Sequence, residues 1–325
     1  VQGSVREDAG WLHINVRLIA SGSGEILWSE NFDDRAVHLF ELQDALTRRM
    51  VVALTGRMNV QDRKELSPPT TRSLQAYDYF LYGRHQFFLY ANAEKNHAAR
   101  EAFERAVAID PTFAMAYAML AWTHAFDAMN GWSESRTESL ETAKALGLRA
   151  VELNEAMPVA YFVRGIAYRE LGDPDHALVE AEKAIAFDPN YAGAYVLQAT
   201  LLYFNGKAQA GLALMKRAIT LNPHHPYNYS FHLGQAQYIL HHYDEAIDAF
   251  NRVLASNPAA ERAHLWLAAA YAQAGLIDDA EWEVQQLLTA NPEISVARIV
   301  SAYPFTQSVD REHFVAGLLK AGIPQ

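Results

Sequence analysis

Histidines gather in the second half of the chain, and this residue type could hold a metal ion. The set comprises His224, His225, His232, His241, His242 and His264. Adjacent histidines in a helix or strand point in different directions, and their spacing matches neither an HExxH helix nor a Cys/His site. We therefore expect histidines of turns and helix ends, and no metal site.

Carboxylates are the second candidate for chemistry, because paired acids can serve as general acid and base. Asp33-Asp34 and Asp278-Asp279 both precede or open an expected helix, where the helix dipole favours acids, so capping explains them. The chain has no cysteine, no GxxxxGK[ST], no GxSxG and no glycine-rich nucleotide loop. We expect no catalytic residue and no cofactor here; an enzyme with an unrecognised pocket is one alternative.

The clearest pattern is a repeat with a fixed period of 34 residues. The matched positions are Tyr161, Gly165, Tyr168, Ala177, Ala181, Ala184 and Pro189, then Tyr195, Ala199, Leu202, Gly211, Met215, Ala218 and Pro223. Small side chains let two antiparallel helices approach closely, and a proline stops the second helix. The pattern predicts stacked helix pairs.

The same frame extends in both directions and gives six repeats between residues 74 and 292. Repeats one, two and five are lengthened; the insertion at 130–137 carries Trp132 and predicts an irregular loop, where we expect specificity to lie. Repeat two also has Glu155 in place of the final proline. These residues resemble the tetratricopeptide repeat (TPR), which implies a mainly α superhelix whose first helices line a concave surface.

The resemblance implies a groove made of large apolar and basic side chains on the first helices. This predicted groove comprises Tyr77, Phe80, Arg84, Phe87, Met115, Met119, Trp122, Phe126, Phe162, Arg169, Tyr203, Phe231 and Tyr238. Aromatic anchors suit an apolar peptide, although aromatic stripes at helical spacing also pack as core. The Lys and Asn set with which some TPR domains clamp a terminal carboxylate is missing; Arg84 or Arg169 could hold one acidic group, or be paired structurally.

The first 61 residues have a different pattern. Residues 11–20 alternate between apolar and polar side chains, which predicts a half-buried strand, and turn clusters flank it. Shorter strands are expected at 3–6 and 25–32, and an amphipathic helix at 37–58. The sequence predicts a small α+β domain with a three-stranded antiparallel sheet and one helix.

Four segments of this domain resemble the second half of a TolB-like α/β domain. They are GSVR at 3–6, VRLI at 16–19, GEILWSE at 24–30 and FELQD at 40–44. The resemblance implies a bacterial signalling parent, either a class III adenylate or guanylate cyclase with TPR repeats or a membrane-tethered winged-helix transcription regulator. Residues 317–324 also resemble the C-terminus of the cyclase-associated arrays.

We expect four segments: a partial TolB-like domain at 1–61, a linker at 62–73, the TPR array at 74–292 and capping helices at 293–325. Residues 1–72 carry 9 basic and 10 acidic side chains, and the rest of the chain 18 and 28. An acidic array disfavours nucleic acid and favours an apolar or basic protein or peptide partner.

No stretch of the sequence is long and apolar enough for a membrane span. We expect a noncatalytic interaction or regulatory fragment of a cyclase-like protein, in the cytoplasm or, if the parent spans a membrane, in the periplasm. An exposed edge of the small sheet makes a homodimer possible.

Overall fold

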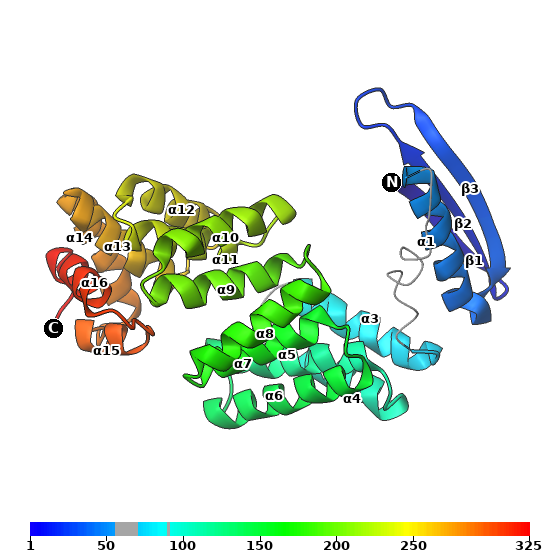
Figure 1. Cartoon of the computed structure of the whole chain (residues 1–325), viewed down its shortest axis with the longest axis horizontal. Helices are drawn as coiled ribbons and strands as arrows, with labels where there is room; N and C mark the ends of the chain where they lie inside the picture. The colour runs from blue at the N-terminus through cyan, green and yellow to red at the C-terminus, as the bar shows by residue number, and fades with distance from the viewer. Residues whose placement is uncertain (56–70, 90–91) are drawn as a thin grey trace. The chain divides into compact units, whose positions relative to one another are not determined.

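The structure is a computed structural model that describes residues 1–55, 71–89 and 92–325 (Figure 1). Within these ranges, a few side chains between residues 37 and 55 and the side chain of residue 89 are left out. The described chain forms two compact units, Val1–Ala91 with Ala98–Ala116 and Asn92–His97 with Tyr117–Gln325. Each unit is described by itself below. Most of the predicted linker at 62–73 lies outside the described residues.

The N-terminal sheet has the predicted three antiparallel strands, β1 (Gln2–Asp8), β2 (Trp11–Ile19) and β3 (Ile26–Arg35), in the order β1-β2-β3. Between β1 and β2, Ala9 and Gly10 both have positive φ, 51° and 80°, as a two-residue type I′ hairpin turn requires. Leu12 and Val16 of β2 are buried. The alternation of the central strand therefore predicted its buried face correctly.

Helix α1 (Leu39–Thr55) packs against β3, and Phe40 and Leu42 are buried near its start. Strand β1 lies at the edge of the sheet and is exposed along its whole length. An exposed edge strand offers unpaired backbone groups to another strand. The homodimer expected from this edge stays a prediction.

Six antiparallel helix pairs follow in the described part of the chain, as the repeat frame predicted (Figure 1). Their bounds are α3 (Leu74–Leu89) with α4 (Ala93–Ile109), α5 (Ala114–Asn130) with α6 (Arg136–Leu153), α7 (Pro158–Glu170) with α8 (Pro174–Phe187), α9 (Ala192–Phe204) with α10 (Ala208–Leu221), α11 (Tyr227–Ile239) with α12 (Tyr243–Ser256), and α13 (Glu261–Ala274) with α14 (Ile277–Ala290).

Small residues bring the two helices of a pair together. Ala177, Ala181 and Ala184 of α8 are all completely buried against α7. A Cβ atom added to Gly211 of α10 would lie 2.9 Å from the Ala199 carbonyl oxygen, and one added to Gly234 of α11 would lie 2.6 Å from the Phe250 ring. No side chain larger than hydrogen fits at these two contacts without displacing its neighbour.

Proline ends the second helices, as predicted. Asp188, Asn222 and Asn257 each stand before a proline and donate their backbone N–H to the carbonyl four residues earlier. Proline cannot continue this pattern, since it lacks an N–H and restricts the preceding residue. In the second pair, which lacks the proline, α6 ends at Leu153, and the side chain of its C-cap Asn154 accepts a hydrogen bond from the backbone N–H of Ala156 at 3.1 Å.

The insertion in the second repeat contains the predicted irregular loop: residues 131–135, which include Trp132, lie outside the helices. The other extra residues lengthen the two helices, to 17 residues in α5 and 18 in α6, against 13 and 14 in α7 and α8. The Ser135 side chain accepts a hydrogen bond from the backbone N–H of Glu138 and so caps α6, which starts at Arg136. Trp132 packs against Phe126, with ring centroids 5.6 Å apart.

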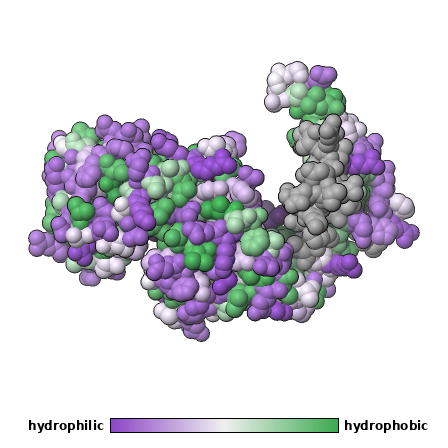
Figure 2. Space-filling view, in the orientation of Figure 1, coloured by the Kyte–Doolittle hydropathy of each residue, from purple (hydrophilic) through white to green (hydrophobic). Residues whose placement is uncertain are grey.

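Two further helices close the C-terminal end, as the sequence predicted: α15 (Val296–Ser301) and α16 (Ser308–Lys320). Helix α16 packs beside α13. Hydrophilic side chains predominate on the face shown in Figure 2, and apolar side chains form small patches between them. None of the described helices combines the length and apolar character that crossing a membrane needs.

Candidate functional site

The first unit places four of the predicted groove residues close together on α3. Phe80 is buried between Phe103 and Phe113, with ring centroids 5.8 and 5.0 Å away. Tyr77 stacks on Phe80, the exposed Arg84 lies over the Phe80 ring at 5.9 Å, and Phe87 is partly exposed. Phe80 is therefore core, and α3 presents Tyr77, Arg84 and Phe87 at its surface.

The remaining predicted residues differ in how far a partner could reach them. Met115, Trp122, Phe126 and Arg169 are partly exposed. The buried ones are Met119, Phe162, Tyr203, Phe231 and Tyr238. Because Tyr203 and Tyr238 are almost completely buried, they contribute to the packing of the repeats, and whether the set as a whole binds a partner stays a prediction.

In the second unit, the first helices α7, α9, α11 and α13, together with α5 from Tyr117 on, form a surface that we call the first-helix face. Its C-terminal half, over α9, α11 and α13, is covered by the chain itself. The covering part is residues 302–320, which we call the C-terminal segment. It runs from the end of α15 through α16 and contacts all three helices.

The apolar contacts of the C-terminal segment are extensive. Phe314 is completely buried and stacks on Trp266 of α13, with ring centroids 4.1 Å apart. Phe305 packs edge-on against Phe204 of α9 at 5.0 Å. A Cβ atom added to Gly317 would collide with the hydroxyl of Tyr238 from α11. This half of the face is packed as tightly as a protein core.

Backbone hydrogen bonds fix the position of the segment. The Thr306 N–H donates to the carbonyl of Phe204 at 3.0 Å, and the Thr306 hydroxyl donates to the Asn205 side chain at 2.8 Å. The carbonyl of His313 accepts hydrogen bonds from the Gln273 amide at 3.1 Å and from the Tyr238 hydroxyl at 3.4 Å. The first-helix face therefore already holds a stretch of polypeptide by main-chain and aromatic contacts.

The N-terminal half of the first-helix face, over α5, α7 and α9, is lined by aromatic rings in edge-to-face contact. Trp122 of α5 lies 5.5 Å from Phe162 of α7, and Phe162 lies 5.5 Å from Tyr191 at the start of α9. Trp122 and Tyr191 are partly exposed. Such rings offer large, rigid contact area to a partner.

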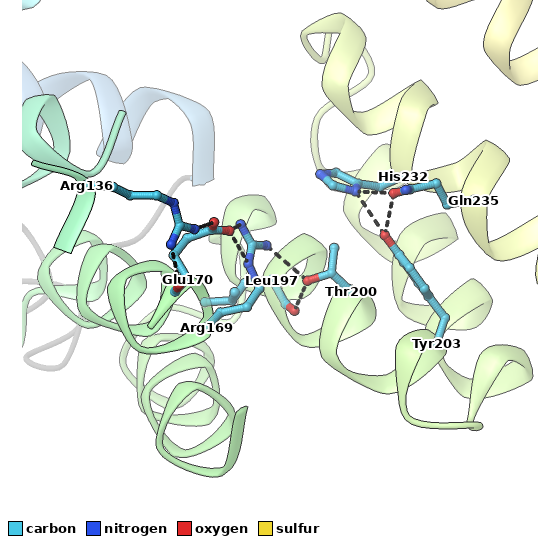
Figure 3. A network of polar contacts seen from close by, with 8 residues as sticks. All are labelled: Arg136, Arg169, Glu170, Leu197, Thr200, Tyr203, His232 and Gln235. Atoms are coloured by element: carbon cyan, nitrogen blue, oxygen red, sulfur yellow. Dashed lines mark hydrogen bonds and ion pairs between the residues drawn. The ribbon is translucent and has the colours of Figure 1, made fainter. Parts of the chain in front are cut away.

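Two arginines and one glutamate meet at the end of α7 (Figure 3). Arg169 at the end of α7 donates to Glu170 Oε1 through Nε and Nη2, at 3.1 and 2.9 Å, and to the Thr200 hydroxyl at 3.2 Å. Arg136 at the start of α6 donates to Glu170 Oε2 at 2.5 Å and to the Glu170 carbonyl at 2.9 Å. The side chain of Arg169 is 16% exposed and that of Arg136 is 52% exposed.

A second polar group continues the network towards α11. The Tyr203 hydroxyl donates to Gln235 Oε1 at 2.8 Å and lies 3.0 Å from His232 Nδ1 (Figure 3). Packing around the imidazole, helped by the charges of Arg169 and Arg262, lowers the pKa of His232 to about 3. His232 is therefore uncharged at neutral pH, and the electrostatic potential around it is positive.

Arg262 at the start of α13 is the third arginine of this region. Its guanidinium carbon lies 5.2 Å from the centre of the Phe231 ring and 5.4 Å from that of Tyr303. Burial would raise the pKa of Glu170, but the charges of Arg169, Arg136 and Arg262 outweigh it and hold that pKa below its ordinary value. The charges of three guanidinium groups thus act on one carboxylate.

Sequence reasoning found Arg169 but missed Arg136, Glu170 and Arg262. Arg136 lies within the insertion that was expected to carry specificity, and Glu170 directly follows Arg169. Their positions in the sequence therefore indicated both residues weakly. Arg262 had none, since it is one of many charged residues at a helix start. We call Arg136, Arg169, Glu170 and Arg262 the arginine cluster.

The histidines that suggested a metal have separate surroundings. His264 pairs with Glu283 at 2.5 Å, His232 belongs to the Tyr203 network, and His225 stacks on Tyr229. Across residues 1–55, 71–89 and 92–325, no group of three or more His, Asp or Glu side chains has an arrangement that could hold a metal ion.

Comparison with known proteins identifies the repeats. Residues 239–303 match the family model described as tetratricopeptide repeat, and residues 170–253 match the model described as anaphase-promoting complex, cyclosome, subunit 3. The solved APC/C hetero-tetramer Cut9–Hcn1 superposes with a TM-score of 0.58 at 17% identity, over 85% of this chain and 46% of that one. The PilF protein of Pseudomonas aeruginosa superposes with a TM-score of 0.51 at 14% identity, over 74% and 97%.

Two curated proteins are similar in sequence. Putative adenylate cyclase 3 of Rhizobium meliloti (strain 1021) is 31% identical over 180 residues, which cover 54% of this chain and 30% of that protein. Small glutamine-rich tetratricopeptide repeat-containing protein 2 of Mycosarcoma maydis is 28% identical over 75 residues, 23% of this chain and 21% of that one. The chain spans less than a third of either relative. Fold, helix pairs and family models agree that it carries an array of tetratricopeptide repeats.

Proposed function

We propose that this chain is a noncatalytic interaction region of a bacterial signalling protein related to adenylate cyclases. Stacked helical repeats generally act as extended binding surfaces, because each pair contributes a strip to one continuous face. The relation to cyclases rests on the 31% identity with putative adenylate cyclase 3, a name that refers to the whole of that protein. The TolB-like domain and the cytoplasmic location expected from the sequence belong to the same proposal.

The observation that carries this function is the state of the first-helix face. Its C-terminal half holds a segment of the same chain through Phe305, Thr306 and Phe314. Its N-terminal half also has aromatic rings on successive first helices, Trp122 of α5 and Phe162 of α7, and the end of α7 carries Arg169 of the arginine cluster. We propose that this second half, over α5, α7 and α9, binds a peptide segment of a partner protein.

The partner segment should carry apolar side chains, because Trp122 and Phe126 supply partly exposed aromatic surface. The expectation of a basic partner came from the net charge of the whole array. Three of the four residues of the arginine cluster are positively charged, so a basic partner residue is not favoured near the cluster.

The test is a selection of peptides from a random displayed library on the purified chain, followed by affinity measurements with single variants. Trp122→Ala should weaken the best peptide about tenfold or more, as loss of an aromatic anchor does. Trp282→Ala is the matched control, since Trp282 is 65% exposed on the second helix α14. Failure to select any peptide, or equal loss in both variants, would contradict the proposal.

A further inference from the structure

The arginine cluster has more positive than negative charge. Arg136, Arg169 and Arg262 contribute three positive charges and Glu170 one negative charge, which leaves a net charge of +2. Among the residues that the structure describes, no ion pair joins these arginines to a second carboxylate. This occurs in a chain whose net charge is −11. The cluster is therefore a local exception to the acidic character of the molecule.

Two members of the cluster, Arg136 and Arg262, are exposed to solvent. The side chain of Arg136 is 52% exposed, and Arg262 is exposed as well. Arg169 and Glu170 lie deeper, with 16% and 21% of their side chains exposed. A ligand can reach the guanidinium of Arg136 while Arg169 and Glu170 hold the geometry.

A structural ion-pair network is the alternative explanation. It accounts for Arg169 and Arg136, which hold Glu170 between the ends of α6 and α7. It does not account for Arg262, whose guanidinium lies over the rings of Phe231 and Tyr303 and has no carboxylate in hydrogen-bond contact among the described residues. Arg262 contributes to the field at Glu170 without forming an ion pair with it.

The C-terminal segment marks where a bound peptide would end. Tyr303, whose ring lies against the Arg262 guanidinium, is near the start of this segment. Thr306 follows it and bonds to Phe204 at the end of α9. A partner segment lying on α5, α7 and α9 would therefore meet the arginine cluster as it approaches the covered half of the face. Its apolar side chains would contact Trp122 before that point.

We propose that the arginine cluster binds a carboxylate side chain of the partner segment, which also carries the apolar residue that packs on Trp122. Guanidinium groups bind carboxylates through parallel, charge-assisted hydrogen bonds, which suits this chemistry. The inference rests on the proposed function and specifies it: the partner is an acidic and apolar segment.

The peptides selected above provide the probe. They should contain Asp or Glu at one fixed distance from an aromatic or aliphatic residue. Replacing that acid by Gln should lower the affinity about tenfold, as loss of a charged hydrogen-bond pair does, and raising the salt concentration should lower it as well. A phosphoserine at the same position tests whether phosphate binds better than carboxylate.

The double variant Arg136→Gln/Arg262→Gln should lose about as much affinity for the acidic peptide and little for its Gln form. Arg149→Gln/Arg252→Gln is the matched control, because it removes the same charge from exposed positions on the second helices α6 and α12. Circular dichroism and thermal unfolding check that the variants fold.

Glu170→Gln gives a result of opposite sign. Removing the carboxylate that competes for the arginines should tighten binding of the acidic peptide, by about threefold or more. A purely structural network predicts only lower stability. Selected peptides that need Trp122 but contain no acid would overturn the carboxylate site and leave the interaction function intact. The same conclusion would follow if acidic peptides bound the Glu170→Gln variant no more tightly, and the double variant no more weakly, than they bind the wild type. Failure to select any peptide would overturn both.

Discussion

The two halves of the first-helix face are built from similar residues but differ in what covers them. Over α9, α11 and α13, the C-terminal segment buries Phe314 and packs Gly317 against Tyr238. Over α5, α7 and α9, Trp122 is partly exposed, and a Cβ added to Gly193 would meet the Phe162 ring at an ordinary contact distance of 3.4 Å. The comparison suggests that an aromatic first-helix face needs a polypeptide against it, which one half obtains from its own chain.

The largest effect is expected where the covered half is most tightly packed. Phe314→Ala should lower the free energy of unfolding by about 3–5 kcal/mol, because it leaves a cavity beside Trp266. Phe187→Ala, at a ring that is 43% exposed on α8, should cost less than about 1 kcal/mol. Urea unfolding measures both. Similar losses in the two variants would mean that the C-terminal segment is not part of the core.

A smaller effect is expected from acid. Burial, with help from His241, lowers the pKa of His313 to about 4, against 6.5 in the unfolded chain. Between these two values the unfolded state binds more protons, so stability falls as the pH is lowered from about 6.5 towards 4. The loss from this group should be on the order of 1–2 kcal/mol, since His313 is partly exposed to solvent.

The His313→Gln variant isolates this contribution. It should flatten the pH dependence of the urea midpoint over that window, whereas changes at the arginine cluster should leave the window unchanged. His313 lies 3.3 Å from the Tyr243 hydroxyl and beside His241, so the pH effect belongs to the covered half. A variant with the same slope as the wild type would contradict the assignment.

The repeats were predictable because their signal is local. The 34-residue spacing of Tyr161 and Tyr195, the buried alanines of α8 and the prolines after the second helices each act within one repeat. The C-terminal segment was not predictable as a cover for the face. Thr306 contacts Phe204 across 102 residues of sequence, and no periodic pattern reports such a contact.

The candidate site was predictable only in part, for a similar reason. Large first-helix residues such as Trp122 and Tyr203 follow the same helical spacing, but Tyr203 is buried and Trp122 is partly exposed. How far each side chain is buried depends on the segment that lies against it. Arg136 and Glu170 form a pair that joins two repeats, and this pairing follows from the packing of α6 on α7.

The smallest effect is expected in the N-terminal half of the first-helix face. Gly193→Ala adds a methyl group to α9 at an ordinary distance from Phe162, so it should change stability by less than about 1 kcal/mol, in the stabilising direction. Thermal unfolding measures it. A large destabilisation would show that this half is as tightly packed as the other.

The most direct test of the account is hydrogen exchange of the whole chain with and without the selected acidic peptide. We predict new protection at the ends of α5, α7 and α9 and at the start of α6, with no change in α16. Peptide-induced loss of protection in residues 308–320, or protection confined to α11 and α13, would show that the peptide displaces the C-terminal segment. That result would contradict the division of the first-helix face into a covered half and a partner-binding half.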